Sequence, residues 1–92
     1  MIVLVMKNRG RTEIMKVILE TCQLEPKTKT KVMYTAFLSY AQIKEYLKSL
    51  VENGLLAENK NGMYLTTNKG QEFLKASRII LELVEPKNRK AF

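Results

Sequence analysis

The sequence predicts a small, mainly α-helical domain with a β-hairpin between its third and fourth helices. Apolar residues recur at helical spacing in the early segments and again near the C-terminus. Between these regions the helical spacing is lost, and two short apolar segments flank Asn61-Gly62. This dipeptide is typical of tight hairpin turns. A chain of 92 residues has room for one domain with a small core.

The first predicted helix starts at Thr12, which we expect to be its N-cap, and Pro26 closes the segment. Apolar residues recur every four positions as far as Ile18 and Cys22, so Cys22 is expected to be a core residue. Residues 1–11 begin with a six-residue apolar run, which predicts an N-terminal strand or arm.

Two further helices are predicted before the hairpin. A segment of alternating lysine and threonine contains Thr28 and Thr30, either of which can cap a short second helix. Ser39 is followed three residues later by Gln42, which predicts a capping box at the start of the third helix. This third helix is expected over residues 39–53.

The hairpin is predicted to follow Gly54, which we expect in the left-handed conformation just past the third helix. Candidate strands cover residues 55–58 and 63–66. Asn61-Gly62 predicts a two-residue type I′ turn, because both central positions of that turn require a positive φ.

The last predicted helix is capped by Thr66 or Thr67. Gly70 is expected to weaken its first turn, because glycine is a poor helix former. Pro86 is expected to stop this helix, since proline cannot continue a helical hydrogen-bond ladder. The residues beyond it are basic.

Charge and composition favour binding over catalysis. Sixteen Lys and Arg residues against nine Asp and Glu give a net charge of +7, which favours nucleic acid or a membrane surface as partner. The chain has no His and one Cys, which excludes a zinc site of nitrogen and sulfur ligands and a His-based catalytic triad. One cysteine forms no internal disulfide and fits a reducing cytoplasm. We therefore expect no enzyme, no cofactor and no small-molecule substrate.

Three helices, a tight hairpin and a final helix are the element order of a winged helix-turn-helix domain. In that fold the third helix enters the major groove and the hairpin is the wing. The expected division is an N-terminal strand or arm over 1–11, the winged helix-turn-helix domain over 12–66, a dimerising C-terminal helix over 67–85 and a basic tail over 86–92.

Several short motifs also carry a family resemblance. They are Lys31-Val32-Met33-Tyr34, Leu38-Ser39-Tyr40-Ala41-Gln42, Tyr46-Leu47, Gly54-Leu55-Leu56, Tyr64-Leu65-Thr66 and Lys69-Gly70-Gln71-Glu72-Phe73-Leu74. Over about residues 12–76 the chain resembles the small archaeal winged helix-turn-helix proteins, above all the ten-kilodalton chromatin-associated DNA-binding proteins of Sulfolobus. The resemblance implies binding to double-stranded DNA. It also implies a long last helix that pairs two subunits as an antiparallel coiled coil, whereas Pro86 is expected to end this helix early.

The candidate DNA contacts fall into a backbone set and a recognition-helix set. The backbone set is Arg9, Arg11, Lys27, Lys29 and Lys31, with Lys60 and Asn61 at the wing tip. The recognition-helix set is Ser39, Tyr40, Gln42 and Lys44, of which Gln suits adenine and Lys suits guanine or phosphate.

Alternatives to these contacts remain open in the sequence. The basic residues can be a solvated surface, and Ser39 and Gln42 can be occupied by capping. Tyr40 shares a helix face with Ile43 and Leu47, so core packing of its ring, with the hydroxyl at the surface, is favoured over stacking on a base or phosphate contact. Glu45 and Glu52, on the polar face of the third helix, would repel phosphate and confine groove contact to its first turn or two.

The last helix is apolar over more than half of its circumference, which predicts a homodimer. The expected interface residues are Phe73, Ala76, Ile79, Ile80, Leu83 and Val84. The functional expectation is a transcriptional regulator or a chromatin-associated architectural protein in the cytoplasm, associated with the nucleoid. The alternatives are a winged helix that contacts only other proteins, and a membrane-surface binder. The membrane binder ranks last because the apolar faces are committed to a core.

Overall fold

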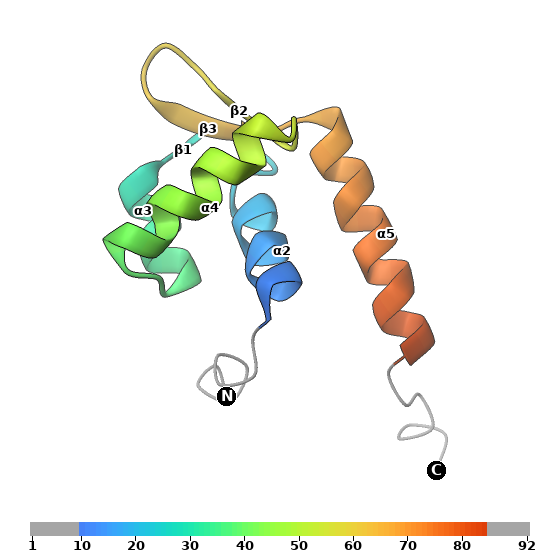
Figure 1. Ribbon diagram of the computed structural model, residues 1–92. Helices are drawn as coiled ribbons and strands as arrows, with labels where there is room; N and C mark the ends of the chain where they lie inside the picture. The colour runs from blue at the N-terminus through green and yellow to red at the C-terminus, as the bar shows by residue number, and fades with distance from the viewer. Residues whose placement is uncertain (1–9, 85–92) are drawn as a thin grey trace.

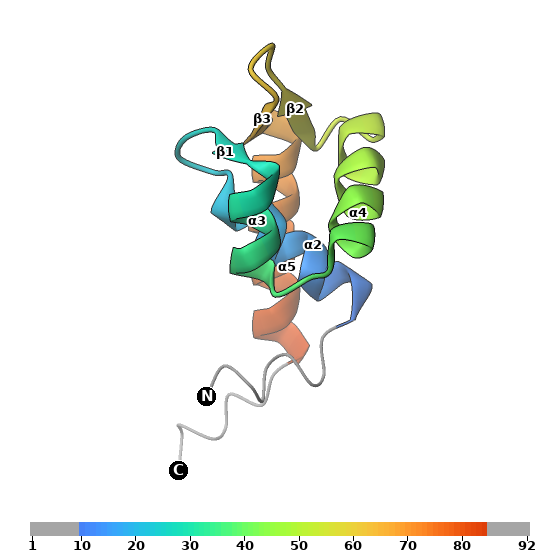
Figure 2. The same cartoon turned by 90° about the vertical axis from the view of Figure 1, so that its left-hand side faces the viewer.

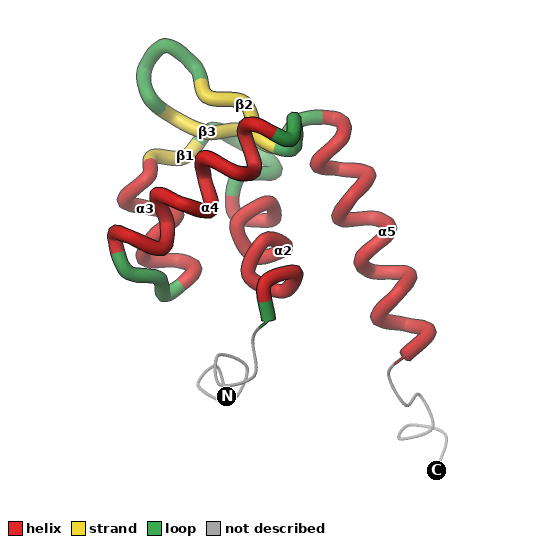
Figure 3. Tube along the Cα trace, in the orientation of Figure 1, coloured by secondary structure: helices red, strands yellow, loops and turns green. Residues whose placement is uncertain are grey.

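The computed structural model describes residues 10–84. The helices of this range are α2 (Arg11–Thr21), α3 (Lys29–Ala36), α4 (Tyr40–Glu52) and α5 (Asn68–Val84). Its strands are β1 (Lys27–Thr28), β2 (Leu56–Glu58) and β3 (Met63–Thr66), which form a small antiparallel sheet (Figure 3). The predicted mainly α fold with a hairpin before its last helix is confirmed. The expectations for an N-terminal strand or arm, for Pro86 and for the basic tail concern residues outside the described range.

One core joins the helices and the sheet. Helix α2 lies in the middle, with α3 and α4 on one side and α5 on the other, and the sheet covers one end of the bundle (Figure 1). The largest fully buried side chains come from all of these parts: Ile18, Leu19, Cys22, Val32, Ile43, Leu50, Leu56 and Leu74. Because Leu74 of α5 packs in the same core as the residues of α2, the first half of α5 is fixed to the domain.

Helix α2 starts two residues earlier than predicted. Its N-cap is Gly10, whose carbonyl accepts the Ile14 N–H at 3.1 Å and which makes no side-chain cap bond. The prediction of Thr12 as N-cap is wrong: Thr12 lies exposed in the first turn. Gly10 is extended (φ −94°, ψ −178°), as an N-cap must be, and the helical backbone follows it directly.

Cys22 is the C-cap of α2 and is completely buried, as the apolar pattern predicted. Burial raises the pKa of its thiol from 9.0 to about 11, although the charge of Lys27 lowers it. The thiol is therefore neutral near pH 7 and fills space in the core. It is a poor nucleophile, because only the thiolate form is a strong one.

The turn between α3 and α4 is closed by caps on both sides. Thr28 caps α3 by accepting the Lys31 N–H at 3.2 Å. Phe37 ends α3 in the left-handed conformation (φ 58°), and its N–H donates to the carbonyl of Tyr34. Ser39 then starts α4 with the predicted capping box.

The capping box and the end of α4 agree with the predictions. The Gln42 N–H donates to the Ser39 hydroxyl at 3.2 Å, and the Ser39 N–H donates to Gln42 Oε1 at 3.0 Å. Asn53 is the C-cap, and Gly54 follows with φ 78°, as expected for a left-handed residue. Helix α4 is thus held in place at both ends by local hydrogen bonds.

Strand β1 was not predicted, because its two residues are polar and show no alternation. It pairs with β3, where Lys27 lies opposite Tyr64 and Thr28 opposite Met63. The order of strands is β1-β3-β2, so β3 of the hairpin is central. This pairing holds the start of α3 against the base of the wing.

The hairpin turn differs from the predicted type I′ turn. Asn59 pairs with Met63, which leaves a three-residue loop, and Gly62 (φ 76°) is its only residue with a positive φ. The Asn59 side-chain oxygen accepts the N–H groups of Asn61 at 2.9 Å and Met63 at 3.0 Å. This side-chain turn fixes the loop without a positive φ at Asn61, so the prediction is wrong by one residue of loop length.

Thr67 rather than Thr66 caps α5. The Thr67 hydroxyl accepts the Gly70 N–H at 3.1 Å, whereas the buried Thr66 hydroxyl donates to the carbonyl of Leu19 at 2.7 Å. A Cβ on Gly70 would collide with the backbone carbonyl of Leu55 and would lie 2.5 Å from Cγ2 of Thr66. Gly70 therefore allows the first turn of α5 to approach the chain after α4, which is a reason that helix propensity alone did not reveal.

We expect Gly70→Ala to lower the free energy of unfolding by about 2 kcal/mol. Overpacking of this kind costs up to about 3 kcal/mol, and the better helix propensity of alanine returns about 1 kcal/mol. Urea unfolding followed by circular dichroism measures the change. Gly10→Ala is the control for an added Cβ without a clash, because a Cβ there meets no atom within 4 Å. Since Gly10 is the N-cap of α2, this variant should lose about 1 kcal/mol or less. If Gly70→Ala left the free energy of unfolding equal or higher, the approach of α5 to the Leu55 carbonyl would not be what requires glycine at this position.

Candidate nucleic-acid interface

Two lysines from different helices meet on one aromatic ring at the start of α4. The Lys29 ammonium lies 5.0 Å from the centroid of the Tyr40 ring, and the Lys44 ammonium lies 5.8 Å from it. Both distances are those of cation–π contacts. The expectation that Tyr40 packs in the core is wrong: Tyr40 is 56% exposed and is a surface residue. We call Lys29, Tyr40 and Lys44 the lysine–tyrosine cluster.

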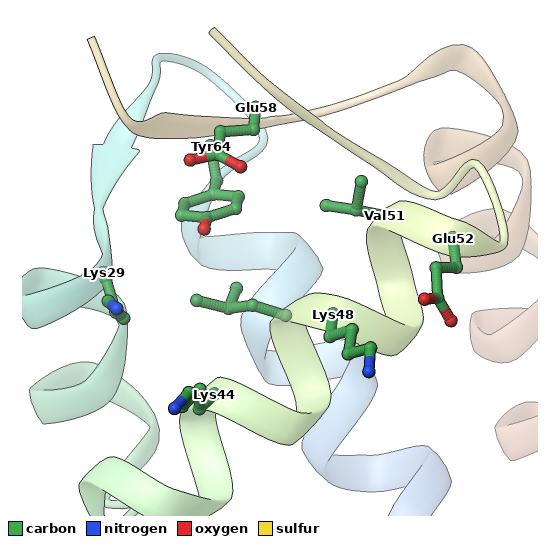
Figure 4. Close-up of a pocket in the computed structure, with 8 residues that line it drawn as sticks. Lys29, Lys44, Lys48, Val51, Glu52, Glu58 and Tyr64 are labelled. Carbon is green, nitrogen blue, oxygen red and sulfur yellow. The ribbon is translucent and has the colours of Figure 1, made fainter. Parts of the chain in front are cut away.

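The lysine–tyrosine cluster borders a groove between α4 and the sheet. The groove has a volume of about 400 Å³ and is lined by Lys29, Lys44, Leu47, Lys48, Val51, Glu52, Glu58 and Tyr64 (Figure 4). Its lining comes from α3, α4, β2 and β3. Lys48 is a basic residue that the sequence reasoning missed, although its spacing of four residues from Lys44 places both on one helix face.

The lysines around this groove are not neutralised by ion pairs. Within residues 10–84 the structure has one ion pair, in which the Lys27 ammonium lies 3.5 Å from a Glu25 carboxylate oxygen. Lys27 also donates to the carbonyl of Thr21 at 3.2 Å, so its charge is already engaged. Lys27 is therefore a poor candidate for phosphate contact, unlike Lys29 and Lys44.

Tyr64 forms part of the groove wall and is half-buried. Burial raises the pKa of its phenol, and the nearby Glu58 carboxylate raises it further. The phenol is consequently neutral at physiological pH. It offers an aromatic surface and a hydroxyl, not a negative charge.

The other predicted contacts lie around α4 in separate places. The Arg11 guanidinium lies 5.1 Å from the centroid of the Tyr46 ring. Since Tyr46 follows Tyr40 by six residues, it lies roughly 240° further around the helix. The structure therefore places Arg11 on a different flank of α4 from the lysine–tyrosine cluster.

Lys31 and the wing tip are accessible. Lys31 is exposed in the first turn of α3, and Lys60 and Asn61 are exposed in the loop between β2 and β3. The wing projects beyond the helices at the end of the domain opposite to the end of α5 (Figure 2). Arg9 lies outside the described residues.

The capping residues of α4 are partly occupied. Ser39 and Gln42 are exposed, but each uses its side-chain oxygen in the capping box. In the described structure the side-chain amide nitrogen of Gln42 donates no hydrogen bond, so it is open to a ligand. Glu45 and Glu52 are exposed on the same helix.

The C-terminal half of α5 presents apolar side chains to solvent. Ile79, Ile80 and Leu83 are exposed, at 53%, 57% and 78%. Ala76 is also exposed, whereas Phe73 is half-buried and packs against the core of its own chain. Val84 is the last residue of the helix, and its side chain lies outside the description.

Residues 10–84 contain neither a membrane-spanning helix nor a cluster of metal ligands. None of their helices has the length and apolar character to cross a membrane. These residues also contain no group of three or more His, Cys, Asp or Glu side chains that could hold a metal ion.

Comparison with known proteins identifies the fold family. The family model for the winged helix-turn-helix matches residues 8–85. A similar solved structure is that of Sso10a-2, a DNA-binding protein from Sulfolobus solfataricus, with 31% sequence identity and a TM-score of 0.71. The match covers 82% of this chain and 81% of that one. The comparison with curated proteins gave no match.

These findings agree with the element order and with the resemblance noted in the sequence. The match to an archaeal protein of the same fold confirms the resemblance to small archaeal winged helix-turn-helix proteins. The family match extends over most of the chain and includes all the elements described above. This chain belongs to the winged helix-turn-helix family.

Proposed function

We propose that this protein binds double-stranded DNA without chemistry, with the first turns of α4 in the major groove. The observation that carries the proposal is the lysine–tyrosine cluster, which places two cations beside the start of α4. The family match and the similarity to a DNA-binding protein support it. In winged helices of this kind, the helix after the turn reads bases and the wing meets the backbone.

The proposed contacts divide into phosphate and base contacts. Lys29, Lys31, Lys44 and Lys60 hold phosphates, because each is a cation on or beside the proposed face with no ion pair among residues 10–84. Ser39, Tyr40, Gln42 and Asn61 offer uncharged polar groups next to them. Arg11 contacts DNA only if the DNA backbone also passes the other flank of α4. Glu45 and Glu52 keep phosphate away from the outward face of α4.

Chemical-shift mapping tests this assignment. A ¹⁵N-labelled sample is titrated with a random-sequence duplex of about 20 base pairs, and the shifted amides are assigned. We expect shifts at residues 29–31, at the first turns of α4 and at the wing tip. Shifts confined to Tyr34 and Phe37 or to α5, or no shifts, would contradict the assignment.

A second candidate function is a winged helix that contacts only proteins. The exposed aromatic side chains of Tyr34 and Phe37, beside the α3–α4 turn, favour it. The duplex titration separates the two functions, because a protein-only module would not respond to DNA.

For a DNA binder, selection on random duplexes separates a regulator, which enriches a defined site, from an architectural protein, which enriches none. A DNA target also implies a cytoplasmic, nucleoid-associated protein.

We expect Gln42→Ala to cost about 1–3 kcal/mol on a preferred site and less on random duplex, if the amide reads a base edge. The substitution also removes one partner of the capping box. Circular dichroism must therefore show an intact helix before the loss is assigned to base recognition. Equal weakening on every duplex would show that Gln42 reads no base and would favour binding by shape and phosphate.

We also propose that the protein is a homodimer through α5. Ile79, Ile80 and Leu83 expose a continuous apolar surface that the core of the single chain does not cover. Ala76 extends this surface along the helix, and Phe73 joins it to the core. Burial of this surface against a second copy would remove it from water and would place two α4 helices in one particle.

A further inference from the structure

The groove between α4 and the sheet has the size and lining of a small-molecule site. Its volume of about 400 Å³ lies within the range of about 300–1,000 Å³ that is usual for ligand pockets. Leu47 is almost fully buried in its floor, and Val51 and the Tyr64 ring are half-buried beside it. An apolar floor of this kind favours a flat hydrocarbon or aromatic body.

The charges around the groove are unevenly placed. Lys29 and Lys44 lie on one side of it and Glu52 on the opposite side, with Lys48 between Lys44 and Glu52, and Glu58 lies above Tyr64 (Figure 4). No carboxylate among residues 10–84 lies within 4 Å of the Lys29 or Lys44 ammonium groups. One anionic group is therefore favoured at the lysine side, and further negative charge toward the glutamates is disfavoured.

We propose that this groove binds a small aromatic carboxylate, with its ring against Leu47, Val51 and Tyr64 and its carboxylate between Lys29 and Lys44. The expected effect of this ligand on DNA binding rests on the proposed function, since the same two lysines are assigned to DNA phosphate. A bound carboxylate neutralises them and competes with the DNA backbone. At a ligand concentration ten times its Kd, simple competition weakens duplex binding about tenfold.

Ligand binding is tested first without DNA, so that its outcome does not depend on the proposed function. The probe is 2-naphthoate, and the uncharged control is 2-naphthalenemethanol. We expect naphthoate to shift the methyl signals of Leu47 and Val51 and the ring signals of Tyr64 in NMR spectra of the full chain. Equal binding of the alcohol, or no shift at 10 mM naphthoate, would overturn the proposal.

Variants of matched charge test the role of the lysines. In Lys29→Ala/Lys44→Ala the naphthoate Kd should rise about tenfold, because each exposed charge pair is worth up to about fivefold. The control, Lys16→Ala/Lys75→Ala, removes the same charge at residues that do not line the groove, so its naphthoate Kd should stay within about twofold. Equal effects in both variants would show only a dependence on net charge and would overturn the proposal.

Competition is measured last, with the wild-type protein on a labelled duplex. We expect naphthoate to weaken duplex binding and the alcohol to have no effect. If naphthoate binds the groove and the protein binds no DNA, the ligand site stands and the proposed function fails. If inorganic phosphate and DNA shift the groove signals but naphthoate does not, the groove belongs to the DNA backbone path and the ligand proposal fails.

Discussion

Replacing Lys29 and Lys44 together by alanine is expected to weaken binding to every duplex roughly sixtyfold at 0.1 M salt. Each lost phosphate contact removes a factor of about eight at that salt concentration, because fewer counterions are released on binding. The slope of log Kobs against log salt concentration should also fall in magnitude by about 2. Fluorescence anisotropy at four salt concentrations measures both quantities.

Tyr40 provides a matched pair of variants for this prediction. Tyr40→Phe keeps the ring that contacts both lysines, whereas Tyr40→Leu removes it at similar bulk. An exposed cation–π contact is worth about 0.5–1 kcal/mol, so Tyr40→Leu should weaken DNA binding several-fold and Tyr40→Phe only slightly. If the double lysine variant and Tyr40→Leu both bind like the wild type, the lysine–tyrosine cluster is not part of the DNA-binding face.

Ile80→Glu is expected to dissociate the proposed homodimer without unfolding the chain. In the dimer a glutamate at this position would be a buried charge without a partner, which costs about 3–5 kcal/mol. In the single chain Ile80 is 57% exposed, so the same glutamate remains in water and the fold should persist. Sedimentation should show about twice the 10.6 kDa chain mass for the wild type and the chain mass for the variant.

Asn68→Glu is the control for this prediction, because it adds the same charge to an exposed position at the start of α5. It should leave the sedimentation of the dimer unchanged. A wild-type protein that is monomeric at micromolar concentration, without dependence on concentration, would contradict the dimer. A variant that remains dimeric would place the interface elsewhere.

The sequence predicted the parts of the fold that are specified by local interactions. The capping box of Ser39 and Gln42 and the left-handed Gly54 depend on residues within a few positions of one another, as does the cap at Thr28, one of the two threonines that the sequence offered. The burial of Cys22 followed from the periodicity of α2. These features need no knowledge of the tertiary structure.

The errors arose where tertiary or side-chain interactions decide the structure. Strand β1 forms because Lys27 and Thr28 pair with a distant strand, and nothing in their own pattern indicates it. The hairpin loop has three residues because the Asn59 side chain bonds within it. The requirement for Gly70 comes from the backbone at Leu55, fifteen residues earlier.

The candidate site was predictable by residue type but not by arrangement. The sequence indicated Lys29, Tyr40 and Lys44 separately, and the structure shows them together on one ring. The placement of Arg11 over Tyr46 depends on how α2 crosses α4, which no local pattern encodes. The groove is formed by three separate segments of the chain, so no local pattern in the sequence predicts it.

The salt dependence of wild-type binding to a random-sequence duplex tests the central claim most directly. Four proposed phosphate contacts, those of Lys29, Lys31, Lys44 and Lys60, predict a slope of about −3.6 per bound protomer in log Kobs against log salt concentration. Measurements at salt concentrations from about 50 to about 300 mM define this slope. A slope near that value supports a face that holds the DNA backbone. Absence of binding at 50 mM salt, or a slope near zero, would contradict it.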